Sequence, residues 1–113
     1  PFPVFIEVNV SGEATKHGCA PADVAQLIDA VEASAHLQLA GFMTVGLNSP
    51  VEADVRAAYA QLRDIRDEAA VRLSIEEAEL ALSMGMSRDL EWAIAEGATI
   101  VRLGTAIFGA RRV

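Results

Sequence analysis

A chain of 113 residues in which 52% are apolar is long enough to bury one hydrophobic core. Its net charge of −7 argues against nucleic acid and anionic membranes as partners, because both are bound through clusters of Lys and Arg. The single cysteine, Cys19, excludes an intrachain disulfide, which fits a reducing compartment. The sequence also shows no apolar membrane span and no basic leader, so we expect a cytoplasmic protein.

The first apolar run, residues 4–10 (VFIEVNV), alternates with the period of a strand. One predicted face carries Val4, Ile6, Val8 and Val10. The opposite face carries Phe5, Glu7 and Asn9, and in a barrel this face would point inward, with Asn9 near the ligand mouth. The polar loop that follows holds Lys16, the only lysine of the chain.

A helix and a second strand come next. Pro21 opens the helix, in which apolar residues recur at helical spacing: Val24, Leu27, Ile28 and Val31. Residues 37–45 (LQLAGFMTV) predict the strand, in which one face is shared by Leu39, Gly41, Met43 and Val45. We expect Gly41 to mark close packing.

The longest helical pattern runs from Val51 to about Leu73. Its apolar positions form one stripe: Val51, Val55, Ala58, Tyr59, Leu62, Ile65 and Ala69. Glu52 with Arg56 and Glu68 with Arg72 are spaced for ion pairs on the solvated face. We find no paired carboxylates placed for acid–base chemistry, and neither His17 nor His36 has the spacing of a metal ligand.

Residues 80–111 contain two turns suited to anions. The run 83–87 (SMGMS) predicts a turn with Ser87 as the N-cap of a helix that ends at Gly97, and backbone N–H groups behind such a cap can hold a phosphate. Residues 99–103 predict a strand in which Arg102 shares a face with Gly104. A buried arginine needs an acceptor, which a bound ligand or an interior acid such as Glu7 would supply. The elements thus alternate β, α, β, α, β, α, β.

The run LSMGMSRDLEWAI followed by GATIVRLGTAIFGAR resembles the C-terminal signature of the pyridoxal-phosphate homeostasis proteins, which are similar in fold to the N-terminal domain of alanine racemase. VNVSGEATKHG and LQLAGFMTV resemble two preceding strand ends of that family. The resemblance implies an α/β fold, the C-terminal half of a (β/α)8 barrel with about four βα units, and residues 1–113 as one partial domain. The cofactor lysine of the family lies on an earlier strand and is absent here.

The resemblance also implies pyridoxal 5′-phosphate as cofactor. In (β/α)8 proteins the loops after the last two strands commonly hold a phosphate, so we expect hydroxyls from Ser83 and Ser87 and backbone N–H groups near Gly104 and Thr105 to do so. Arg102 would face the pyridine nitrogen. The candidate cofactor-binding residues are Asn9, Met43, Ser83, Met84, Ser87, Arg102, Gly104 and Thr105. No catalytic and no metal-ligating residue is expected.

Three functions remain open from the sequence. The favoured one is a protein of intracellular pyridoxal phosphate homeostasis, a carrier or reservoir without turnover. A racemase-like enzyme would need a catalytic lysine and a base such as tyrosine, but the only tyrosine, Tyr59, lies on a helical stripe. A half-barrel scaffold is the third. An isolated half would expose one sheet face and two edges, which predicts pairing with the missing N-terminal half or with a second copy.

Overall fold

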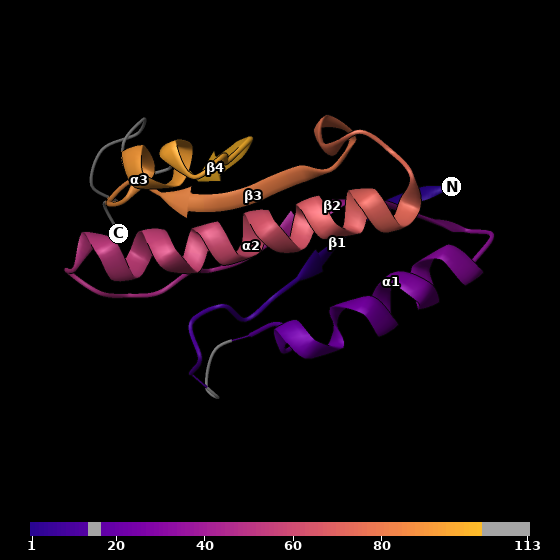
Figure 1. Ribbon diagram of the computed structural model, residues 1–113, viewed down its shortest axis with the longest axis horizontal. Helices are drawn as coiled ribbons and strands as arrows, with labels where there is room; N and C mark the ends of the chain where they lie inside the picture. Colours follow the sequence, from indigo (N-terminus) through magenta and orange to yellow (C-terminus); the bar gives the residue numbers. More distant parts are fainter. Residues whose placement is uncertain (14–16, 103–113) are drawn as a thin grey trace, which may run out of the picture.

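The computed structural model describes residues 1–13 and 17–102 (Figure 1). These residues form the strands β1 (Phe2–Glu7), β2 (Leu37–Met43), β3 (Ala81–Met86) and β4 (Ile100–Arg102). Between the strands lie the helices α1 (Val24–Ala33), α2 (Glu52–Leu73) and α3 (Leu90–Ala95) and the 3₁₀ turns η1 (Pro21–Asp23) and η2 (Glu77–Glu79). The predicted alternation is confirmed. No described helix combines the length and the apolar character that a membrane crossing requires.

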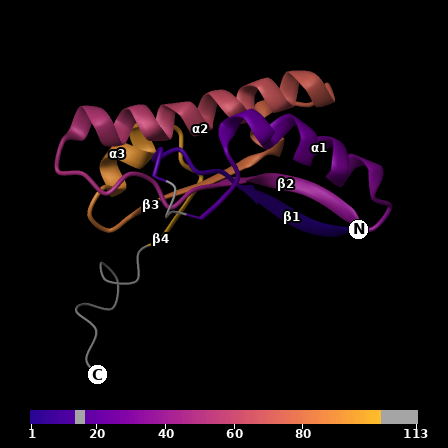
Figure 2. The same cartoon turned by 90° about the horizontal axis from the view of Figure 1, so that it is seen from below.

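The four strands form one parallel sheet in the order β1-β2-β3-β4. Each strand is joined to its neighbour through a helix, because parallel neighbours need a crossover connection. Figure 2 shows that the helices lie on one side of the sheet. This is the arrangement of consecutive βα units in a (β/α)8 barrel, with the helices outside and the open sheet face toward the barrel interior. The predicted fold class is confirmed.

The core fills the space between the sheet and the helices. Its largest fully buried apolar side chains come from the strands, from residues next to them and from α2: Tyr59, Phe42, Leu62, Leu80, Leu82, Met84, Val8 and Val55. In β1 the predicted alternation is correct, since Ile6 is buried while Phe5 on the other face is 37% exposed. On the open face Ile100 of β4 is likewise exposed, at 45%.

Strand β2 departs from strict alternation at Ala40. Val4 pairs with Leu39 but Phe5 pairs with Gly41, so Ala40 is an extra residue in β2. Leu39 and Phe42 are therefore both buried, and the predicted common face of Leu39, Gly41, Met43 and Val45 is wrong. A single inserted residue reverses the faces of everything that follows it. Met43 pairs with Glu7, which lies on the open face.

The segment after β3 also differs from the prediction. Strand β3 continues through Met86, so Ser83 lies in the strand and the turn occupies residues 87–89. The N-cap residue of α3 is Asp89, so Ser87 is not the cap. The other end is as predicted: Gly97 has φ +104°, and the N–H groups of Gly97 and Ala98 donate to the carbonyls of Ile94 and Ala93.

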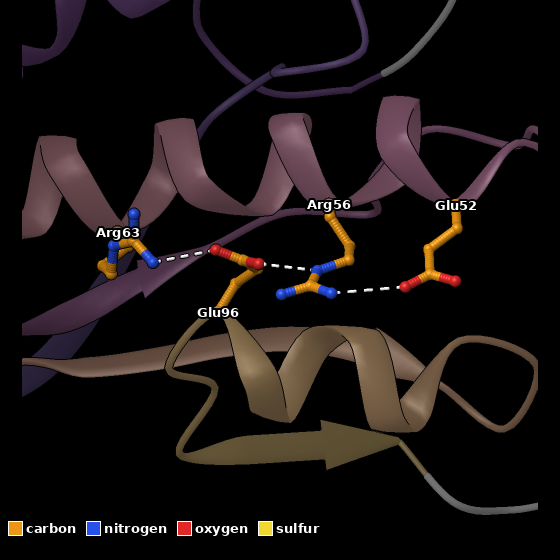
Figure 3. Close-up of polar contacts among 4 residues, drawn as sticks. All are labelled: Glu52, Arg56, Arg63 and Glu96. Carbon is orange, nitrogen blue, oxygen red and sulfur yellow. Dashed lines mark hydrogen bonds and ion pairs between the residues drawn. The ribbon is translucent and has the colours of Figure 1, made fainter.

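Helix α3 is attached to α2 by an ion-pair cluster (Figure 3). The carboxylate of Glu96 accepts hydrogen bonds from Arg56 Nε at 2.7 Å and from Arg63 Nη1 at 2.8 Å. Arg56 also pairs with Glu52 at 3.2 Å, as its spacing predicted. The second predicted pair is wrong, because Arg72 bonds Asp29 of α1 at 2.8 Å instead of Glu68.

Candidate functional site

Four of the residues predicted to bind the cofactor lie at the carboxyl edge of the described sheet, where its parallel strands all end. Asn9 follows β1, Met43 ends β2, Ser87 follows β3 and Arg102 ends β4. This edge is where active sites lie in (β/α)8 proteins. The topology therefore brings four segments that are distant in sequence to one side of the molecule.

One row of paired residues crosses the sheet near this edge. Met43 pairs with Glu7 on one side and with Ser83 on the other, and Ser83 pairs in turn with Ile100. All four side chains are at least partly exposed, whereas Leu82 and Met84 on either side of Ser83 are buried. Met43 and Ser83 are thus neighbours on the open face. Met84 belongs to the core, so only its backbone could reach a ligand on that face.

Arg102 reaches across β3 to the end of β2. Its Nη2 donates to the backbone carbonyl of Thr44 at 3.0 Å. Thr44 is itself held in place, because its N–H donates to the Ser83 carbonyl at 3.1 Å and its hydroxyl accepts from the Gly46 N–H at 3.2 Å. The acceptor that Arg102 finds is therefore a backbone carbonyl, and not the Glu7 carboxylate considered from the sequence. A guanidinium has further N–H donors with which to meet an anion or a ring nitrogen.

Asn9 organises its own loop. Its Oδ1 accepts from the N–H of Ser11 at 3.1 Å and from the Ser11 hydroxyl at 2.7 Å, and its Nδ2 donates to the Glu13 carbonyl at 2.7 Å. Such a side-chain turn orders the backbone after a strand. Contact between Asn9 and a ligand stays a prediction. Gly104, Thr105 and Lys16 lie outside the described residues.

Tyr59 and Asp89 were not expected at this edge. The Tyr59 hydroxyl donates to Asp89 Oδ2 at 2.7 Å, and Asp89 Oδ1 accepts the Met86 N–H at 2.9 Å. Tyr59 is fully buried, and burial, followed by the bond to Asp89, raises the pKa of its hydroxyl well above the ordinary value. One signal was available: a tyrosine in an apolar stripe needs a polar partner for its hydroxyl.

The electrostatics at this edge differ from those of the whole chain. The net charge is −7, yet the cations Arg88 and Arg102 both lie close enough to Tyr59 to oppose the rise of its pKa. The carboxylate of Asp89 is engaged by Tyr59 and Met86.

A pocket of about 320 Å³ lies beside Asp89 and is lined by Leu47, Asn48, Ser49, Pro50, Arg88, Asp89 and Trp92. Among residues 1–13 and 17–102, no cluster of His, Cys, Asp and Glu is placed to hold a metal ion.

Comparison with known sequences gives one consistent result. The family model of the alanine racemase N-terminal domain matches residues 1–112. A pyridoxal phosphate homeostasis protein of Pseudomonas aeruginosa is 48% identical over 111 residues, which cover 98% of this chain and 46% of that protein. The human protein of the same name is 34% identical over 110 residues, covering 96% of this chain and 40% of its own length. The chain thus spans less than half the length of these curated relatives.

Solved structures agree with the sequence relatives. A Bifidobacterium adolescentis protein of unknown function superposes with a TM-score of 0.85 at 41% identity, over 94% of this chain and 42% of that protein. PipY of Synechococcus elongatus, solved with PLP bound, superposes with a TM-score of 0.76 at 30% identity, over 95% of this chain and 49% of PipY. Both matches extend across the described sheet and helices.

Proposed function

Because the chain belongs to the alanine racemase N-terminal domain family, we propose that it supplies part of a pyridoxal 5′-phosphate site and serves in intracellular homeostasis of that cofactor. The observation that carries the proposal is the convergence of Met43, Ser83 and Arg102 at one sheet edge from three separate strands. PipY, a relative of similar fold, was solved with PLP bound, and relatives at up to 48% identity are named for pyridoxal phosphate homeostasis.

The donors at the edge suit a phosphorylated pyridine. In the proposal, the hydroxyls of Ser83 and Ser87 hold phosphate oxygens together with backbone N–H groups at Gly104 and Thr105. Arg102 is kept in place by the Thr44 carbonyl. It would lie toward the ring nitrogen of the cofactor, and Met43 would contact the ring. Asn9 orders the neighbouring loop. The cations Arg88 and Arg102 near this edge also favour an anionic ligand.

The proposed role is to hold or deliver the cofactor, not to catalyse with it. Bound pyridoxal phosphate supplies an electron sink for carbanions, and that sink is strong when the ring nitrogen is protonated. The permanently charged guanidinium of Arg102 would oppose that protonation. Tyr59, the only tyrosine of this chain, is buried and donates to Asp89, so it is not placed to act as a base toward a ligand. These two features favour a carrier or reservoir over the racemase-like alternative.

Fluorescence titration tests the proposal. Trp92 is half-buried in α3 and lines the pocket beside Asp89, so binding of pyridoxal phosphate at this edge should quench it saturably. Inorganic phosphate should compete. Arg102→Ala is expected to weaken binding by about tenfold or more, because it removes a charge-assisted contact. Arg72→Ala is the matched control, because Arg72 is bonded to Asp29 on α1. This variant should bind pyridoxal phosphate like the unchanged chain. Equal binding by the two variants, or no competition by phosphate, would contradict the proposal.

A further inference from the structure

Tyr59 contacts both turns that border the candidate site. Its hydroxyl donates to Asp89 in the turn after β3. Its ring lies against Gly46 in the turn after β2, where a Cβ placed on Gly46 would come within 2.9 Å of the Tyr59 ring and hydroxyl oxygen. Gly46 has φ +84°, a conformation that glycine adopts readily. One α2 side chain thus contacts two loops separated by about forty residues of sequence.

A continuous chain of hydrogen bonds runs from Tyr59 to the strand end. The carboxylate of Asp89 accepts the Tyr59 hydroxyl on one oxygen, at 2.7 Å, and the Met86 N–H on the other, at 2.9 Å. Through these two bonds the carboxylate links α2 to both ends of the turn at residues 87–89, which includes Ser87. A tyrosine hydroxyl is protonated at physiological pH and can therefore donate, and burial raises its pKa further.

The second turn is connected to the arginine. The Gly46 N–H donates to the Thr44 hydroxyl, and the Thr44 carbonyl accepts from Arg102. The Tyr59 ring against Gly46 therefore limits where that carbonyl, and with it the guanidinium, can lie. The two proposed ligand-binding groups, Ser87 and Arg102, both depend on loops that Tyr59 contacts.

We propose that Tyr59 is a positioning residue of the cofactor site, which sets the geometry of both turns through its hydroxyl and its ring; this rests on the proposed function. Without the hydroxyl, one Asp89 oxygen loses its donor while remaining close to the turn that carries Ser87. A carboxylate released from that bond repels a phosphate at the same turn. The consequence is selective: the phosphorylated ligand loses affinity and the unphosphorylated ring does not.

The test is Tyr59→Phe, which keeps the ring against Gly46 and removes only the hydroxyl. We expect affinity for pyridoxal phosphate to fall about fivefold to tenfold, and affinity for pyridoxal to change by less than about twofold. Adding Asp89→Asn to Tyr59→Phe should restore part of the lost affinity for pyridoxal phosphate, because it removes the charge that repels the phosphate while the amide oxygen can still accept the Met86 N–H. The control is Thr99→Val, which removes a hydrogen bond from the Leu82 N–H at 2.8 Å, at the opposite end of β4. It should leave the ratio of the two affinities unchanged.

Amide hydrogen exchange gives a readout that needs no ligand. The Met86 N–H should exchange faster in Tyr59→Phe and at the wild-type rate in Thr99→Val. Equal loss of affinity for both ligands, or unchanged exchange at Met86, overturns the positioning role. If the unchanged chain does not bind pyridoxal phosphate, the proposed function fails. The exchange rate at Met86 then decides by itself whether Tyr59 holds the turn.

Discussion

At the scale of single residues, Gly41 shows how little room the sheet leaves. It lies in β2 opposite Ala81 of β3, and a Cβ at this position would come within 2.3 Å of the Ala81 carbonyl oxygen. That contact is with backbone and not with the end of a flexible side chain, so only a shift of a strand could relieve it. Tyr59 and Gly46 form a similar close approach at the strand ends.

We expect Gly41→Ala to lower the free energy of unfolding by about 2–4 kcal/mol, because the added methyl group must separate β2 from β3. Chemical denaturation measures this directly. Gly12→Ala is the matched control: nothing lies within 4 Å of its Cβ position, but φ is +76°. It should cost only the backbone strain, about 1 kcal/mol. Equal destabilisation by the two substitutions would show that the close packing at Gly41 is not the cause.

At the scale of elements, α3 depends on its neighbours. Six residues are too few for an independently stable helix. Ala93 is buried, Gly97 ends the helix with a left-handed turn, and Glu96 joins it to Arg56 and Arg63 of α2. The Glu96 side chain is only 12% exposed, and its hydrogen bond to Arg56 is the main reason that its pKa is lowered. Since α3 follows the turn that carries Ser87, this attachment also supports the candidate site.

The pH dependence of stability follows from that lowered pKa. A carboxyl group whose pKa is lower in the folded state stabilises the fold above its unfolded pKa, near 4.5, and this contribution is lost as pH falls through the folded value. Glu96→Gln should therefore melt below wild type at pH 7, by about 3–5 °C. The difference should shrink as the pH is lowered below about 4.

Thermal melts between pH 7 and pH 3 measure this difference. Glu91→Gln is the control, because Glu91 is an exposed glutamate in the same helix. This variant should melt at the wild-type temperature across the whole pH range. A gap between Glu96→Gln and wild type that persists undiminished at pH 3 would argue against an ionic origin.

At the scale of the whole molecule, the described chain is a sheet covered on one side (Figure 2). The helices pack on one face, and the other face exposes apolar side chains such as Phe5, Met86 and Ile100. Strands β1 and β4 are the two edges of the described sheet. Exposed apolar faces and unpaired strand edges are normally covered in a stable protein. We therefore propose that residues 1–113 form one partial domain, which an N-terminal barrel half or a second copy would complete.

Association is the matching prediction. Analytical ultracentrifugation of this chain alone should detect dimers or larger species, and Phe5→Lys should weaken their formation because it places a charge on the open face. Val71→Lys is the control: Val71 is 80% exposed on α2, on the helical side, and its substitution should leave association unchanged. A stable monomer over a wide concentration range would contradict this interpretation.

Local periodicity was sufficient for the order of the elements, most of the stripe of α2, the alternation of β1 and the end of α3 at Gly97, because each depends on residues within a few positions of one another. Val51, which was predicted in that stripe, is 50% exposed and precedes the helix. The family resemblance indicated the half-barrel and the edge at which the candidate residues gather. The position of Gly41 inside a predicted strand was enough to select it as a point of close packing.

Only the tertiary structure decided how distant segments pair. The extra residue at Ala40, the extension of β3 to Met86 and the bond from Arg72 to Asp29 each depend on a neighbouring strand or helix. The same is true of Tyr59 with Asp89 and of Arg102 with Thr44, whose partners lie 30 and 58 residues away in sequence. Hydrogen bonds and strand register are satisfied by whichever group the fold brings near, and that proximity is a property of the assembled sheet, not of the local sequence.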